Sequence, residues 1–151
     1  MTTREIMALC AQLPAVTSDS VFGPGSVCYR VGGRIFAMVC PQGIPGALCI
    51  LRADARIPRE EAPPLVTLRC TPDFGDFYKR QYPNTVYRPY HSPPAQQPHG
   101  VTVLVDGSLP DGEWPQMIGQ AWSTVLGKLP KKVQREITAG IPANAAKNNA
   151  E

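Results

Sequence analysis

The five cysteines and two histidines of this chain carry the side chains that most readily act as nucleophiles, bases or metal ligands near neutral pH. His91 and His99 both lie in the proline-rich stretch "HSPPAQQPHG", a setting typical of solvated loop residues rather than of a catalytic base. Neither this pair nor Cys40 with Cys49 has a recognised metal-ligand spacing, and no two cysteines form a CxxC pair. The sequence therefore predicts no catalytic residue, no metal site and no cofactor, and we expect a protein that is not an enzyme. An enzyme with a small-molecule pocket is an alternative function that no motif supports.

Two glycine-containing turns are candidates for phosphate-binding loops. "VGGR" and "DGSLPDG" match neither a P-loop nor a dinucleotide fingerprint, which need their glycines at fixed offsets between a parallel strand and a helix. "DGSLPDG" precedes a predicted helix, so its free amides could hold an anion, but Asp106 and Asp111 disfavour one electrostatically. This turn is explained as a connection between two elements.

Clustered basic residues are the remaining chemical signal. Arg30 and Arg34 flank the turn of a predicted hairpin, Lys79 and Arg80 lie on an exposed helix face, and more cations gather between positions 128 and 135. Such clusters can contact phosphates, although a solvated surface is the alternative for any one of them. The net charge of +3 and the pI near 8.7 permit contact with a polyanion without requiring it.

The totals indicate one domain in a reducing compartment. A chain of 151 residues with 43% hydrophobic and 18% charged residues can bury one core, and its 17 prolines and 13 glycines imply many turns. The odd number of cysteines favours free thiols over a disulfide framework. No apolar run approaches the roughly 18 residues of a membrane span, and the start of the chain does not read as a signal peptide. We expect a cytoplasmic protein with no membrane partner.

In the first half of the chain, the patterns predict a helix and a central hairpin. Apolar residues recur at helical spacing between Thr2 and Leu13, and Thr2 or Thr3 can cap that helix. "SVCYRVGGRIFAMVC" predicts a hairpin whose two-residue turn is Gly32-Gly33. This turn pairs Val31 with Arg34, Tyr29 with Phe36 and Val27 with Met38, and it places both arginines at the tip. Both hairpin faces are largely apolar, so we expect it in the middle of a sheet.

The second half predicts an alternation of strands and helices. Residues 41–64 are expected to form a loop excursion with one short strand, "ALCIL", before the strand "LVTLR". A helix starts at Thr71-Pro72, with an apolar stripe of Phe74, Phe77, Tyr78 and Tyr82. After an extended "TVYRPY" and a proline-rich loop come the strand 101–105, a helix capped by Asp111 or Gly112 with Trp114 on its apolar face, and a short helix after Pro130. We expect an α+β domain over residues 1–138, with an antiparallel sheet and helices packed against it, and a disordered tail over 139–151.

Three stretches of this sequence resemble the MmcQ/YjbR family of small bacterial proteins. They are "YRVGGRIFAMV", then "LRCTPDFGDFYKRQYPNTVYRPYH", and then "VTVLVDGSLPDGEWPQMIGQAWSTVLGKLPKK". The resemblance runs from about Arg4 to Arg135 in consistent order, and the last stretch is its most specific part. It implies an α+β fold with an antiparallel sheet, similar to type III secretion chaperones and to frataxin-like proteins. It also implies the family's usual description as DNA-binding, which rests on a double-wing arrangement.

Carried over position by position, the first wing is the Gly32-Gly33 hairpin. Arg69 stands where the family usually has a basic residue before "TPD", and the basic "LPKK" corresponds to residues 129–132. Two features depart from the family pattern. Residues 41–64 are an insertion, and Gly100 replaces the aromatic residue that the family typically has after the histidine before the last strand, so a binding role for that corner is in doubt.

The resulting hypothesis is a cytoplasmic, non-enzymatic DNA-binding protein. Six cations are predicted to contact phosphates: Arg30, Arg34, Arg69, Lys128, Lys131 and Lys132. The alternative is a protein-interaction or chaperone-like module that uses the apolar second face of the sheet, or the 41–64 excursion, to receive a protein partner or form a homodimer.

Overall fold

The computed structural model describes residues 1–90 and 92–140. In this part of the chain, six strands form one sheet in the order β1-β2-β3-β4-β6-β5, and every neighbouring pair is antiparallel. The strands are β1 (Val16–Asp19), β2 (Val27–Val31), β3 (Arg34–Cys40), β4 (Leu65–Arg69), β5 (Val86–Tyr87) and β6 (Gly100–Leu104). The expected α+β fold with an antiparallel sheet is confirmed.

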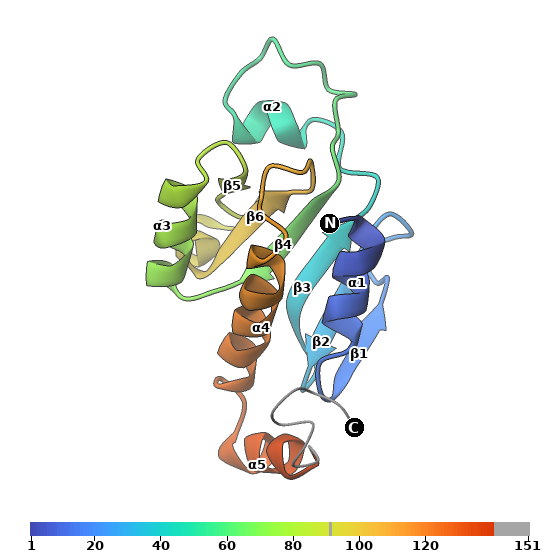
Figure 1. Cartoon of the computed structure of the whole chain (residues 1–151), viewed down its shortest axis with the longest axis vertical. Helices are drawn as coiled ribbons and strands as arrows, with labels where there is room; N and C mark the ends of the chain where they lie inside the picture. The colour runs from blue at the N-terminus through green and yellow to red at the C-terminus, as the bar shows by residue number, and fades with distance from the viewer. Residues whose placement is uncertain (91, 141–151) are drawn as a thin grey trace.

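The helices surround this sheet. They are α1 (Thr3–Ala11), α2 (Ala47–Leu51), α3 (Pro72–Gln81), the 3-10 helix η1 (Pro94–His99), α4 (Glu113–Leu126) and α5 (Lys131–Ala139). Figure 1 shows α1 and α4 side by side over one face of the sheet, with α2 at one end of the molecule and α5 at the other. Of the two predicted caps, Thr2 is the one that caps α1, and it does so in a capping box: its hydroxyl accepts from the Glu5 amide, and the Glu5 carboxylate accepts from the Thr2 amide.

The main core lies between the sheet and the helices α1 and α4. Successive strand residues point to opposite faces, so Val66 and Leu68 of β4 and Val101 and Val103 of β6 reach the same layer. Trp114 of α4 enters this layer and is almost fully buried. The apolar spacing of the last long helix therefore predicts its buried side correctly.

A smaller core occupies the opposite face at the α2 end of the sheet. Leu65 and Leu104 point away from α4 and pack with Ala47 and Leu48. The expectation of a strand at "ALCIL" is therefore wrong, because this segment is the helix α2. An apolar run of five residues does not by itself distinguish a strand from a helical turn. No strand pairs with this segment within the described residues, whereas α2 buries its apolar side on the existing sheet.

The hairpin turn is confirmed, but the predicted register holds only at its tip. Val31 pairs with Arg34 as expected. A β-bulge then shifts the pairing, so that Tyr29 faces Ala37 instead of Phe36, and Val27 faces Val39 instead of Met38. The extra residue in β3 lets Phe36 enter the main core, where it is fully buried. The strand β1, which pairs along β2, was not predicted because "VTSD" is short and mostly polar.

Further differences concern the second half of the chain. Phe77 of the predicted apolar stripe is 49% exposed, whereas Tyr78 is buried. Thr71 precedes α3 as predicted, but its side chain makes no capping hydrogen bond. The proline-rich segment contains η1, and the last strand is Gly100–Leu104 instead of 101–105. Most of the tail predicted to be disordered, residues 141–151, lies outside the described residues.

Candidate functional site

Four of the six predicted phosphate-binding residues line one hollow of about 370 Å³. Arg30 and Arg34 come from the β2–β3 hairpin, Arg69 from the end of β4, and Lys128 from just beyond the end of α4. The remaining lining residues are Ile35, Gln96, Thr124 and Val125. These eight residues of the described chain include no carboxylate, so the hollow is strongly basic although the chain carries a net charge of only +3.

The topology explains this convergence. Because β3 and β4 are antiparallel, the start of β3 and the end of β4 lie at the same end of the sheet. The C-terminal end of α4 reaches that same end, as Figure 1 shows for the turn between β2 and β3 and for the last turn of α4. Cations separated by almost a hundred positions in the sequence therefore share one surface.

A close contact fixes the hairpin tip against the end of α4. Gly32 has a φ angle of 59°, and a Cβ built on it would lie 2.9 Å from Leu129 Cδ2 and closer still to Cδ1. Only glycine combines this left-handed conformation with such an approach. Leu129 is itself almost buried. The first half of "LPKK" therefore has a packing role, because it positions the turn that carries Arg34.

Arg30 does not project from the tip as expected. Its side chain is 26% exposed, its Nε donates to Asp19 Oδ2 at 2.7 Å, and its Nη1 donates to the Gly33 carbonyl at 3.0 Å. The hydrogen bond from Arg30 lowers the pKa of Asp19, so this carboxylate stays charged at neutral pH. The reason for the difference is the unpredicted strand β1, which brings Asp19 beside Arg30. Arg30 therefore stabilises the turn, and its positive charge is partly neutralised by Asp19 before any ligand binds.

The other three cations of the hollow are available. Arg34 and Lys128 are exposed, as is Arg69, and within the described residues none of the three takes part in an ion pair. Lys79 of the second predicted cluster differs, because its Nζ lies 3.5 Å from Asp76 Oδ1. Like charges gathered without a counter-charge attract an anion of matching shape.

Lys131 and Lys132 do not line the hollow. They are exposed in the first turn of α5, which Figure 1 places just beyond the end of α4. The structure thus separates the six predicted residues into a set of four around one hollow and a pair on an adjoining helix.

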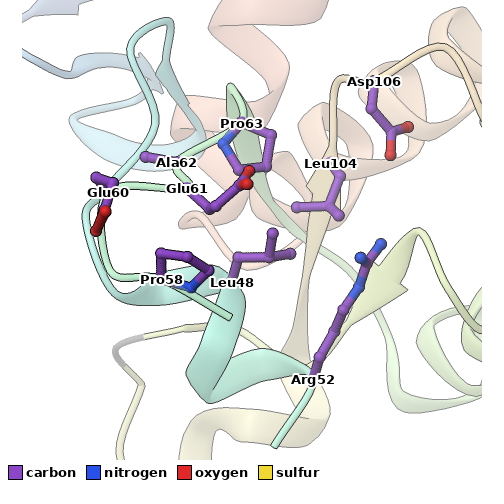
Figure 2. A pocket seen from close by; sticks show the side chains of 9 residues that line it. All are labelled: Leu48, Arg52, Pro58, Glu60, Glu61, Ala62, Pro63, Leu104 and Asp106. Atoms are coloured by element: carbon purple, nitrogen blue, oxygen red, sulfur yellow. The ribbon is translucent and has the colours of Figure 1, made fainter. Parts of the chain in front are cut away.

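A larger hollow of about 530 Å³ lies elsewhere, between the excursion and β6 (Figure 2). Its charged residues are mixed, since Arg52 is accompanied by Glu60, Glu61 and Asp106. Figure 2 shows Glu60 and Asp106 on opposite sides of the hollow, so the carboxylates do not converge. Arg52 is already engaged, because it donates to the Tyr87 hydroxyl at 2.8 Å and to the Asn84 carbonyl at 3.1 Å. This hollow is unsuited to a phosphate.

Within the described residues, the geometry supports neither a metal site nor reactive thiols at Cys10 and Cys70. Among residues 1–90 and 92–140, no three histidine, cysteine or acidic side chains gather closely enough to hold a metal ion. Burial raises the pKa of the Cys10 thiol to about 12 and that of Cys70 to about 11, and both remain protonated at neutral pH. No helix in the same residues is both long and apolar enough to cross a membrane.

Sequence reasoning missed an apolar groove beside the basic hollow. The groove measures about 260 Å³ and shares Ile35 and Arg69 with the hollow. Its other lining residues include Phe22, Met38, Ile44 and Tyr90, together with Gly100, the position that departs from the family pattern. The signal that could have revealed it is Phe22, an aromatic residue placed between polar and glycine residues in "SVFGPG".

The fold defines this protein as an α+β domain with a six-stranded antiparallel sheet in the described residues and its longest helix across one face. The chain belongs to the YjbR family, whose model matches residues 11–124. This confirms the resemblance inferred from the sequence. The matched region includes Arg30, Arg34 and Arg69 but ends before Lys128.

Solved structures share this architecture. A Deinococcus radiodurans protein with a DUF419 domain is 19% identical, with a TM-score of 0.71 over 91% of this chain and 88% of the other. A Pseudomonas syringae protein is 16% identical in its crystal structure, with a TM-score of 0.63 over 82% of this chain and 98% of that one. Its solution NMR structure gives 18% identity and a TM-score of 0.56, over 82% and 92% of the two chains. At such identities the likeness establishes the fold alone. No curated protein matches this chain.

Proposed function

We propose that this protein is a cytoplasmic, non-enzymatic DNA-binding protein whose basic hollow contacts the phosphate backbone. The observation that carries the proposal is the convergence of Arg34, Arg69 and Lys128, without an ion-pair partner among the described residues, on one hollow of about 370 Å³. Cations that neutralise phosphates release condensed counterions, and this release supplies most of the affinity of sequence-independent binding.

Several features of the site favour a polyanion over a single small anion. Three available cations from three separate parts of the chain present more charge than one carboxylate or one sulfate can neutralise. Lys131 and Lys132 add two exposed positive charges in the first turn of α5, a few positions beyond Lys128 in the chain. Gln96 adds a neutral polar group that can donate to phosphate oxygens, whereas the Thr124 hydroxyl already donates to the Gln120 carbonyl at 2.7 Å.

The alternative function is a protein-interaction module, and the surface available for a protein partner is smaller than the sequence suggested. The two candidate surfaces, the second sheet face and the excursion, cover each other in part, because α2 packs on Leu65 and Leu104. Met38, Thr67 and Arg69, which lie further along this face, line the groove beside the basic hollow. A protein partner would therefore meet the same cations.

The test is fluorescence anisotropy with a labelled DNA duplex, titrated between about 50 and 200 mM salt. The variant Arg34→Gln/Arg69→Gln/Lys128→Gln removes the three available charges. We expect weaker binding and a flatter salt dependence, because each lost phosphate contact lowers the slope of log K against log salt concentration by about 0.9.

The matched control is Arg4→Gln, which removes an exposed positive charge from α1. The start of α1 lies away from the β2–β3 turn in Figure 1, so this variant should retain the wild-type salt slope. Absence of binding at low salt would contradict the proposal. An equal loss per charge in the control and in the site variant would show that net charge, and not this hollow, governs binding.

A further inference from the structure

The apolar groove opens directly beside the basic hollow. Ile35 and Arg69 line both, so a ligand that fills the groove has its neighbouring atoms within reach of the cations. The groove lies between the β1–β2 loop, the strands β3 and β4, and the segment that follows β5. Its volume of about 260 Å³ falls just below the ~300–1,000 Å³ of small-molecule sites, which suits one flat group better than a whole drug-sized ligand.

Phe22 is the most exposed lining residue with an aromatic ring. Its side chain is 67% exposed, although burial of such a ring would be favourable. The loop that carries Phe22 is held in place, because the Val21 amide donates to Asp19 Oδ1 at 3.1 Å and the Gly23 amide donates to the Ser20 carbonyl at 3.0 Å. Asp19 also binds Arg30, so one carboxylate fixes both the aromatic loop and the edge of the hollow.

Charge complementarity limits what can occupy these two adjoining spaces. The occupant needs a flat apolar group for the groove and, directly beside it, several negative charges for Arg34, Arg69 and Lys128. A fatty acid brings one negative charge, whereas successive nucleotides bring one phosphate each beside a planar base. Exposed aromatic rings next to a basic channel are typical of proteins that bind single-stranded nucleic acid.

We propose that this site takes single-stranded DNA, with one unpaired base stacked on Phe22 in the groove and the adjoining phosphates in the hollow. The inference rests on the proposed function and specifies its substrate. A duplex keeps its bases stacked inside the helix and can use only the hollow, whereas a single strand can use both spaces. Single-stranded DNA therefore binds more tightly than a duplex of equal length.

The experiment compares three labelled probes of about 15 nucleotides: an oligothymidylate, a duplex, and an oligomer of the same backbone that lacks bases. Each is titrated by anisotropy against the wild type, Phe22→Ala and Val21→Ala. Val21 is the matched control, since it is 64% exposed in the same loop but does not line the groove. Both positions are exposed, so both variants should fold, and circular dichroism checks this.

Phe22→Ala should weaken oligothymidylate binding at least about fivefold, the loss of one stacked base, and change duplex binding less than about twofold. Val21→Ala should change neither. The base-free oligomer should bind about as weakly to the wild type as to Phe22→Ala. If the duplex binds with the expected salt dependence while Phe22→Ala has no effect or the base-free oligomer binds as well as oligothymidylate, the groove takes no base and only the proposed function stands. If no probe binds at low salt, both proposals are wrong.

Discussion

Replacing Gly32 by alanine tests whether the hairpin tip is positioned by its contact with Leu129. Two costs add at this position. An L-residue at a φ angle of 59° pays about 1–2 kcal/mol of backbone strain. The new methyl group also overlaps the end of the Leu129 side chain, which is 6% exposed and has to shift to make room. Overpacking of this kind costs about 1–3 kcal/mol. We expect Gly32→Ala to lower the free energy of unfolding by about 2–5 kcal/mol.

Gly33→Ala is the matched control, because it should carry the same backbone strain but no overlap with Leu129. Gly33 also has a positive φ angle, 81°, but a Cβ built on it meets nothing within 4 Å. It should therefore cost only the backbone strain, about 1–2 kcal/mol. Urea denaturation measures the difference, and 1–3 kcal/mol corresponds to roughly 0.5–1.5 M in the midpoint at a typical slope of about 2 kcal/mol per M.

The double variant Gly32→Ala/Leu129→Ala tests the overlap between the two side chains directly. Removing the Leu129 side chain removes the overlap, so the two substitutions together should cost clearly less than the sum of their separate effects. DNA affinity should follow the same order, because a displaced tip moves Arg34 away from Lys128. Equal destabilisation by Gly32→Ala and Gly33→Ala, or full additivity in the double variant, would refute this account of the tip.

Two further predictions concern ionisable groups whose burial differs. Burial raises the pKa of Tyr29 and Tyr78 to about 12, and that of Cys10 also to about 12, whereas the unfolded chain loses these protons near 10.0 and 9.0. The folded state therefore holds more protons in this range, and denaturant titration should show stability that is constant with respect to these groups below pH 9 and falls between pH 9 and 12. Cys49 is the only cysteine of the described chain that is not buried, so iodoacetamide should alkylate it first, as mass spectrometry of the native protein can show. Equal labelling of Cys10 and Cys49 would contradict the described burial.

The convergence of cations on one hollow explains how a mildly basic protein can present a strongly basic site. The net charge of +3 results from 15 basic and 12 acidic residues, so composition predicts no more than weak attraction to nucleic acid. The sheet and α4 place four of the basic residues around one hollow whose lining contains no acid. Glu60 and Glu61 of the excursion and Asp106 of the β6–α4 turn line a different hollow. The electrostatic field at the site is therefore set by the local arrangement of charged residues and not by the net charge of the chain.

Local patterns determined most elements of this fold. The Thr2 capping box, the Gly32-Gly33 turn and the Thr71-Pro72 helix start act over a few residues, so sequence alone reveals them. Clustering and family resemblance also predicted six cations as a related set without any structure: Arg30, Arg34, Arg69, Lys128, Lys131 and Lys132.

Tertiary structure decided what depends on contacts between distant segments. The short strand β1 pairs along the edge of β2, and "ALCIL" forms a helix whose apolar side packs on Leu65 and Leu104 at the face of the sheet. The bulge at Phe36 reflects core packing, which no hairpin pattern encodes. The Asp19–Arg30 pair and the groove beside Arg69 follow from these placements, since each joins residues from separate elements. Sequence names the cations, and only the folded sheet determines which of them are available and what lies next to them.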